Sequence, residues 1–173
     1  MSVSITAAVF PAQRVAVEAL FREYQMSLGI DLGFQGFEDE LRGLPGKYAL
    51  PDGRLLLGWS GEGSEPAGCV ALRRLDEETS EIKRLYVRPS ARGTGLGGIL
   101  ARAIVGEAKR AGYRRVWLDT LPSMTEAVAL YGKLGFTDIA PYTYNPLEGA
   151  RYLGLEFDSI RADDDKLYPM ITD

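Results

Sequence analysis

Residues 84–98 read Arg-Leu-Tyr-Val-Arg-Pro-Ser-Ala-Arg-Gly-Thr-Gly-Leu-Gly-Gly, and this stretch decides more about the fold than any other part of the chain. An apolar strand leads into a glycine-rich loop, and the loop opens directly onto an amphipathic helix. Glycines keep side chains away from backbone N–H groups where a helix N-terminus leaves its amides unpaired and partly positive. Such a turn is typical of a binding site for a diphosphate.

A dinucleotide-binding pattern is one interpretation of the loop. Gly93, Gly95 and Gly98 spell G-x-G-x-x-G, and Asp119 lies near the end of the next expected strand. In dinucleotide-binding folds, however, the first glycine follows its strand almost at once, whereas residues 88–92 intervene here. The unit also follows an antiparallel meander, which argues against this interpretation. A Walker-type phosphate loop is excluded because no Gly-Lys-Ser/Thr follows the glycines.

Composition limits the classes of partner. The chain has 173 residues, 46% of them hydrophobic, as expected for a single globular domain covering residues 1–173. Its net charge of −4 provides no basic field for nucleic acid, so we expect no nucleic-acid partner. No stretch has the pattern of a signal peptide or a membrane span, so we expect no membrane partner and a cytoplasmic location.

Two residue types are scarce, and both restrict the chemistry. Histidine is absent, which excludes a Ser-His or Cys-His nucleophile and argues against a transition-metal site, so we expect no metal. Cys69 is the only cysteine, so no intrachain disulfide can form. Its apolar neighbours indicate a small buried hydrophobic residue.

Basic residues are concentrated around the glycine loop, at Lys83, Arg84, Arg88 and Arg92. In an acidic protein this concentration indicates either a small polyanionic ligand or ordinary solvated surface charge.

Hydrophobic periodicity and turn residues predict the element order β-α-α-β-β-β-α-β-α-β-β. The expected strands are 3–7, 55–59, 67–72, 81–87, 115–120, 142–144 and 152–157. The expected helices cover about 17–28, 37–44, the stretch from the loop to Gly112, and 127–134. Ser123 and Glu126 form a capping-box pattern before the last helix. This order predicts an α/β (α+β) fold with a mixed, mostly antiparallel central sheet, one βαβ crossover and flanking helices.

The strand before the glycine loop has an irregular pattern. Ile82, Leu85 and Val87 do not keep one parity, so either both faces of the strand are buried or a bulge shifts its phase. The sequence leaves both alternatives open.

A second reading of the loop is R-x-x-G-x-G, at Arg92, Gly95 and Gly97. With the preceding strand 81–89, it resembles the GNAT superfamily of N-acetyltransferases. Residues 127–136, Ala-Val-Ala-Leu-Tyr-Gly-Lys-Leu-Gly-Phe, are similar to that family's late helix, A-x-x-L-Y-x-K-x-G-F. Two motifs in the right order make coincidence improbable.

The resemblance implies an acyl-CoA N-acyltransferase-like fold, with acetyl-CoA as donor and a primary amine of a small molecule or peptide as acceptor. It places the CoA-binding core at about 55–158, acceptor-side helices at 1–50 and a C-terminal tail at 159–173. A non-catalytic acyl-CoA sensor is the alternative function. The oligomeric state is left open between a monomer and a homodimer.

The resemblance also implies roles for individual residues. Tyr131 would protonate the departing CoA thiolate, and Glu81 would act as the general base through a water molecule. Residues of the strand and the loop would bind the donor: Leu85, Tyr86, Val87, Arg92, Gly93, Thr94, Gly95, Leu96 and Gly97.

Overall fold

A computed structural model describes residues 2–157 and 168–171. Its sheet has the strand order β1-β2-β3-β4-β5-β7-β6. The strands are β1 (Val3–Ala7), β2 (Arg54–Ser60), β3 (Gly68–Arg74), β4 (Thr79–Val87), β5 (Arg115–Thr120), β6 (Thr137–Asp138) and β7 (Arg151–Glu156). Only β4 and β5 pair in parallel, and the helix α3 (Leu96–Arg110) connects them. The expected mixed, mostly antiparallel sheet with one βαβ crossover is therefore confirmed.

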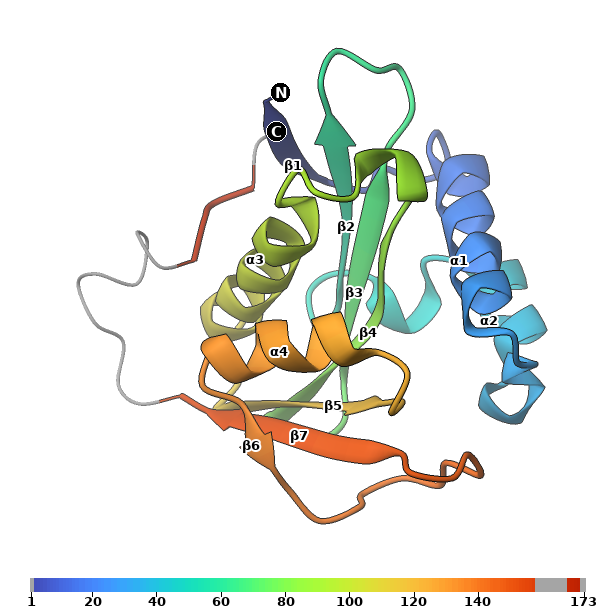
Figure 1. The fold of residues 1–173 in the computed structure, drawn as a ribbon. Coiled ribbons are helices and arrows are strands. Elements are labelled where there is room, and N and C mark those ends of the chain that lie inside the picture. Colours follow the sequence, from blue (N-terminus) through green and yellow to red (C-terminus); the bar gives the residue numbers. More distant parts are fainter. Residues whose placement is uncertain (1, 158–167, 172–173) are drawn as a thin grey trace.

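Helices cover both faces of the sheet (Figure 1). One face carries α3 and α4 (Thr125–Lys133), and the other carries α1 (Arg14–Leu28) and α2 (Phe37–Arg42), together with the short 3-10 helices η1 (Leu32–Gln35) and η2 (Gly46–Tyr48). A third 3-10 turn, η3 (Pro89–Ala91), follows β4. Successive strand residues point to opposite faces, so Leu56 joins the core under α3 while Leu55 and Leu57 join the core under α1.

Two strand glycines let α3 approach the sheet closely. A Cβ at Gly58 would lie 2.8 Å from a methyl of Leu96, and one at Gly68 would lie 3.1 Å from a methyl of Leu100. The N-terminal turn of α3 therefore rests directly on β2 and β3, which fixes the glycine loop relative to the end of β4.

The structure resolves the irregular pattern of β4 as a bulge. Cys69 pairs with Tyr86 and Ala71 with Lys83, so β4 carries one extra residue between these pairs. Arg84 sits there with φ of 64°, a left-handed conformation that is rare for a residue with a side chain. The buried thiol of Cys69 donates to the Arg84 carbonyl at 3.3 Å, and this burial confirms the interpretation of Cys69.

Two sequence predictions about local structure were wrong. Residues 142–144 form no strand. The side chain of Tyr142 packs on Trp117 and holds this segment in place. The outer neighbour of β7 in the sheet is β6 instead. The capping box is absent: α4 has Met124 at its N-cap and no side-chain cap. Of the expected tail, residues 159–167 and 172–173 lie outside the described residues, and Tyr168 packs beside Gly106 of α3.

Candidate active site

The parallel ladder between β4 and β5 is short, and this creates the site. Thr79–Glu81 of β4 pair with Arg115–Trp117 of β5. The two strands continue to Val87 and Thr120, but beyond these three residues they no longer pair with each other. The strands separate there, and the opening between them is lined by their side chains and by α4.

A long groove with a volume of about 840 Å³ lies over the glycine loop. One wall is the end of β4 and the other is α4 with the turn before it. Its lining includes eight of the nine residues expected to bind the donor: Leu85, Tyr86, Val87, Arg92, Gly93, Gly95, Leu96 and Gly97. Thr94 is the exception, since its hydroxyl donates to the Ala91 carbonyl at 2.6 Å and closes the loop.

The loop presents backbone amides to this groove. Gly93 and Gly95 have φ of 82° and 84°, a conformation that glycine adopts without steric cost. Gly95 is the N-cap of α3 and has no side chain that could cap this end, although the Thr94 hydroxyl accepts a long hydrogen bond of 3.4 Å from the Leu96 amide. The positive end of the helix dipole lies at the groove, which Gly95, Leu96 and Gly97 line.

A smaller cavity of about 40 Å³ adjoins the long groove. We call it the inner pocket. The two share Tyr24, Leu85, Met124 and Ala127. The other residues of the inner pocket come from η1, β4, β5 and α4: Gln35, Ile82, Lys83, Arg84, Leu118, Asp119, Thr120 and Tyr131. A ligand in the groove and a second one in the inner pocket would therefore meet near Leu85.

Tyr131 lies in the wall of the inner pocket. The residue is 4% exposed, and its ring packs against Phe136 with 5.2 Å between centroids. Burial, and to a lesser extent the nearby Tyr24, raise the pKa of its hydroxyl. The hydroxyl therefore keeps its proton at neutral pH.

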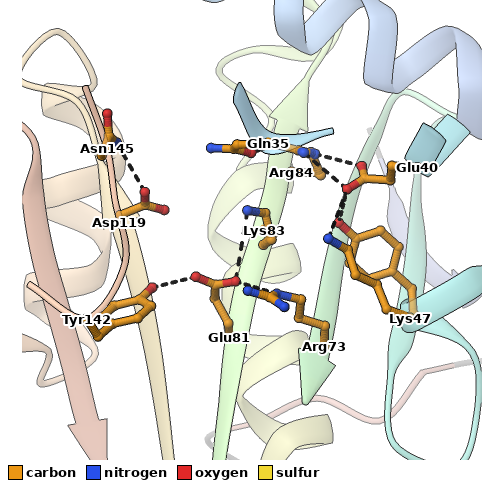
Figure 2. Close-up of polar contacts among 11 residues, drawn as sticks. Gln35, Glu40, Lys47, Arg73, Glu81, Lys83, Arg84, Asp119, Tyr142 and Asn145 are labelled. Carbon is orange, nitrogen blue, oxygen red and sulfur yellow. Dashed lines mark hydrogen bonds and ion pairs between the residues drawn. The ribbon is translucent and has the colours of Figure 1, made fainter. Parts of the chain in front are cut away.

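Glu81 is more deeply placed than a strand-end carboxylate. It is 1% exposed and accepts hydrogen bonds of 2.6 Å from both Arg73 Nε and Tyr142 Oη (Figure 2). Burial raises its pKa, but Lys83, Arg73 and the Tyr142 hydroxyl outweigh that effect and hold the pKa below its ordinary value. Glu81 does not line the inner pocket. Its carboxylate lies 3.9 Å from the ammonium of Lys83, which does line the pocket.

Lys83 and Asp119 place opposite charges on the two walls of the inner pocket (Figure 2). The Lys83 side chain is 9% exposed, and burial lowers its pKa to about 8 despite the attraction of Glu81. On the β5 side, Asp119 accepts a hydrogen bond from Asn145 Nδ2 at 3.1 Å.

The basic residues near the loop do not surround the groove as the sequence suggested. Arg84 pairs with Glu40 at 3.0 Å, Arg88 pairs with Glu23 at 2.9 Å, and of the four only Arg92 lines the groove. Lys83, Arg84 and Arg88 do not line the groove, and each is paired with a carboxylate: Glu81, Glu40 and Glu23.

Sequence reasoning missed the importance of Gln35, Lys83 and Asp119 for the inner pocket. Asp119 entered only through the dinucleotide pattern, and Lys83 only as a member of the basic cluster. A parallel strand pair with a polar residue near the end of each strand was the available signal, because such ends meet at one edge of a sheet. Nothing in the local sequence of Gln35 indicated its position.

Within residues 2–157 and 168–171, no three or more Cys, Asp or Glu side chains are grouped so that they could hold a metal ion. None of the helices in this described part has the length and apolarity needed to cross a membrane.

The model of the acetyltransferase (GNAT) family matches residues 17–136 of this chain. The chain belongs to the GNAT family. It is 37% identical over 156 residues to an uncharacterised N-acetyltransferase of Schizosaccharomyces pombe, covering 90% of this chain and 95% of that protein. The GNAT assignment supports N-acetyltransferase activity and argues against the dinucleotide interpretation of the loop.

Solved structures of GNAT proteins share the fold. An acetyltransferase of Streptococcus agalactiae superposes with a TM-score of 0.73 at 20% identity, covering 90% of this chain and 98% of that one. A Salmonella typhimurium protein solved with acetyl-CoA superposes with a TM-score of 0.68 at 20% identity, covering 94% and 98%. The family as a whole uses acetyl-CoA as its acetyl donor.

Proposed function

We propose that this GNAT protein transfers the acetyl group of acetyl-CoA to a primary amine of a small molecule or peptide. The observation that carries the proposal is the junction of the long groove with the inner pocket at Leu85, beside Tyr131. The groove is large enough for an extended donor, and the inner pocket offers a separate place for an acceptor. Direct attack of one on the other then needs no covalent enzyme intermediate.

The proposed donor site uses mainly backbone groups. The pyrophosphate of acetyl-CoA would accept hydrogen bonds from amides of the loop between Arg92 and Gly97, at the positive end of α3. The pantetheine arm would lie along Leu85, Tyr86 and Val87. The bulge supports this placement, since Arg84 and Leu85 have no register partner on β3 and their backbone groups are released from the ladder.

The proposed reaction is attack of a neutral amine on the thioester carbonyl. The resulting oxyanion would be stabilised by a backbone amide of Leu85 or Val87, and collapse of the tetrahedral intermediate would break the C–S bond. Tyr131 would give its proton to the leaving thiolate and regain one from solvent. The proton lost by the amine would pass to Glu81 through water, as the sequence suggests, or to Asp119, which faces the inner pocket directly.

Amine-dependent release of the CoA thiol tests this function and separates an enzyme from the alternative, an acyl-CoA sensor. We expect thiol release from acetyl-CoA to rise when a library of amines is added, with acetylated amine detected by mass spectrometry in equal amount. A sensor would bind acetyl-CoA and release no thiol with any amine.

The cytoplasmic location stays a prediction of the sequence.

A further inference from the structure

Two cations of β4, Lys83 and Arg84, line the inner pocket. Figure 2 shows that each belongs to a cluster: Lys83 with Glu81 and Arg73, and Arg84 with Glu40 and Lys47. Each cluster has two cations and one carboxylate. The Lys83 and Arg84 side chains are 9% and 2% exposed, and burying a charge is costly unless an opposite charge compensates it.

Of the four cations in these clusters, Lys83 makes the longest ion-pair contact and also lines the inner pocket. Arg73 makes the short contact to Glu81, at 2.6 Å, whereas the Lys83 ammonium stands 3.9 Å from the same carboxylate and lines the inner pocket. Arg84 also lines the pocket, but its guanidinium is bound to Glu40 and Gln35. Lys83 therefore directs the excess positive charge into the cavity.

Gln35 adds a neutral donor beside Lys83. Its Oε1 accepts a hydrogen bond from Arg84 Nη1 at 2.8 Å, which fixes which end of the amide is oxygen. The amide nitrogen consequently points away from Arg84, and in Figure 2 it extends toward the side where Asp119 and Asn145 lie. Gln35 and Lys83 together offer N–H donors to one anionic group.

The opposite wall suits a cation. Asp119 accepts one hydrogen bond from Asn145, so lone pairs of its carboxylate remain for a ligand ammonium. The cavity of about 40 Å³ has room for only a few atoms the size of water, so the group that enters it is small.

We propose that the acceptor is a small amine that also carries a carboxylate, as an amino acid does, with its carboxylate bound by Lys83 and Gln35 and its amine held between Asp119 and the donor site at Leu85. This inference rests on the proposed acetyl transfer and narrows its substrate class. A diamine or polyamine would bring a second cation against Lys83 and would be disfavoured.

Matched pairs of acceptors test the inference. The CoA thiol release assay is run with L-amino acids and with their carboxamides, which present the same amine without the negative charge. We expect kcat/KM for the acid to exceed that for the carboxamide by at least about tenfold, the value of a charge-assisted hydrogen bond. The carboxamide has the less basic amine and hence more free base at neutral pH, so amine reactivity cannot cause this preference.

Three variants locate the preference in the structure. Lys83→Met should lower kcat/KM for the acid about tenfold or more, mainly through KM, and should bring the ratio of acid to carboxamide rates close to one. Gln35→Met should lower the preference in the same direction and serves as the test if Lys83→Met does not fold. Lys47→Met is the matched control: it removes a lysine that pairs with Glu40 outside the inner pocket, and the preference should persist.

The outcomes separate this inference from the proposed function. Equal rates for acid and carboxamide, or a preference that survives Lys83→Met and Gln35→Met, would overturn the inference while acetyl transfer stands. Binding of acetyl-CoA with no acetylation of either member of any pair would overturn it as well and would favour the sensor. A failure to bind acetyl-CoA would defeat the proposed function itself.

Discussion

Tyr131→Phe should lower kcat by about 100-fold or more, the usual contribution of a positioned general acid. Tyr131 lines the inner pocket, as does Leu85, which also lines the groove proposed to hold the donor. Its raised pKa keeps it protonated, so it can supply the proton that the departing thiolate needs. Removing one oxygen atom preserves the ring and its packing on Phe136. The melting temperature and the affinity for acetyl-CoA should therefore not change.

Tyr113→Phe is the matched control for this variant. The Tyr113 hydroxyl donates to the Asp52 carbonyl at 2.6 Å, and neither residue lines the groove or the inner pocket. This variant should keep full kcat. If Tyr131→Phe also turns over at the wild-type rate in steady-state assays with saturating substrates, Tyr131 has no part in the chemistry.

Arg84→Met should lower the free energy of unfolding by about 3 kcal/mol, the lower end of the range for breaking a buried ion pair. The side chains of Arg84 and Glu40 are 2% and 5% exposed, and two hydrogen bonds join them. Methionine keeps much of the volume but leaves the Glu40 carboxylate buried with Lys47 and the Tyr48 hydroxyl as its only polar contacts. Urea unfolding monitored by circular dichroism measures the loss.

An exposed ion pair provides the control. Arg22→Met removes a guanidinium that pairs with Glu38 in solvent, and it should leave the free energy of unfolding nearly unchanged. A similar small effect for Arg84→Met would contradict the view that this pair anchors α2 and η1 to β4. The same variant frees Gln35, so we also expect weaker binding of the acceptor.

The features that the sequence predicted correctly are local or periodic. The loop 92–98, the amphipathic helix α3 and the apolar strand β2 depend on short stretches of chain, and the sequence predicted each of these elements. The motif around Tyr131 correctly indicated the family. The phase of β4 could be narrowed to two alternatives, because a bulge and a doubly buried strand give the same irregular pattern.

The features that could not be predicted depend on contacts between distant segments. Arg84 and Glu40 are 44 residues apart, and Tyr142 and Glu81 are 61 residues apart. The first contact keeps Arg84 out of the groove over the glycine loop, and the second holds residues 142–144 through the Tyr142 side chain instead of strand pairing. Ser123 lies in the groove wall although its spacing to Glu126 matches a cap. The partners and positions of these side chains depend on the tertiary structure, and the local sequence does not encode them.

Backbone amides at the start of α3 are proposed to hold the diphosphate of acetyl-CoA. Isothermal titration calorimetry of the wild-type protein with acetyl-CoA, with CoA and with NAD tests this binding. We expect saturable binding of acetyl-CoA and of CoA at one site per chain, and no heat of binding with NAD. No binding of acetyl-CoA at saturating concentration, or binding of NAD in its place, would contradict it.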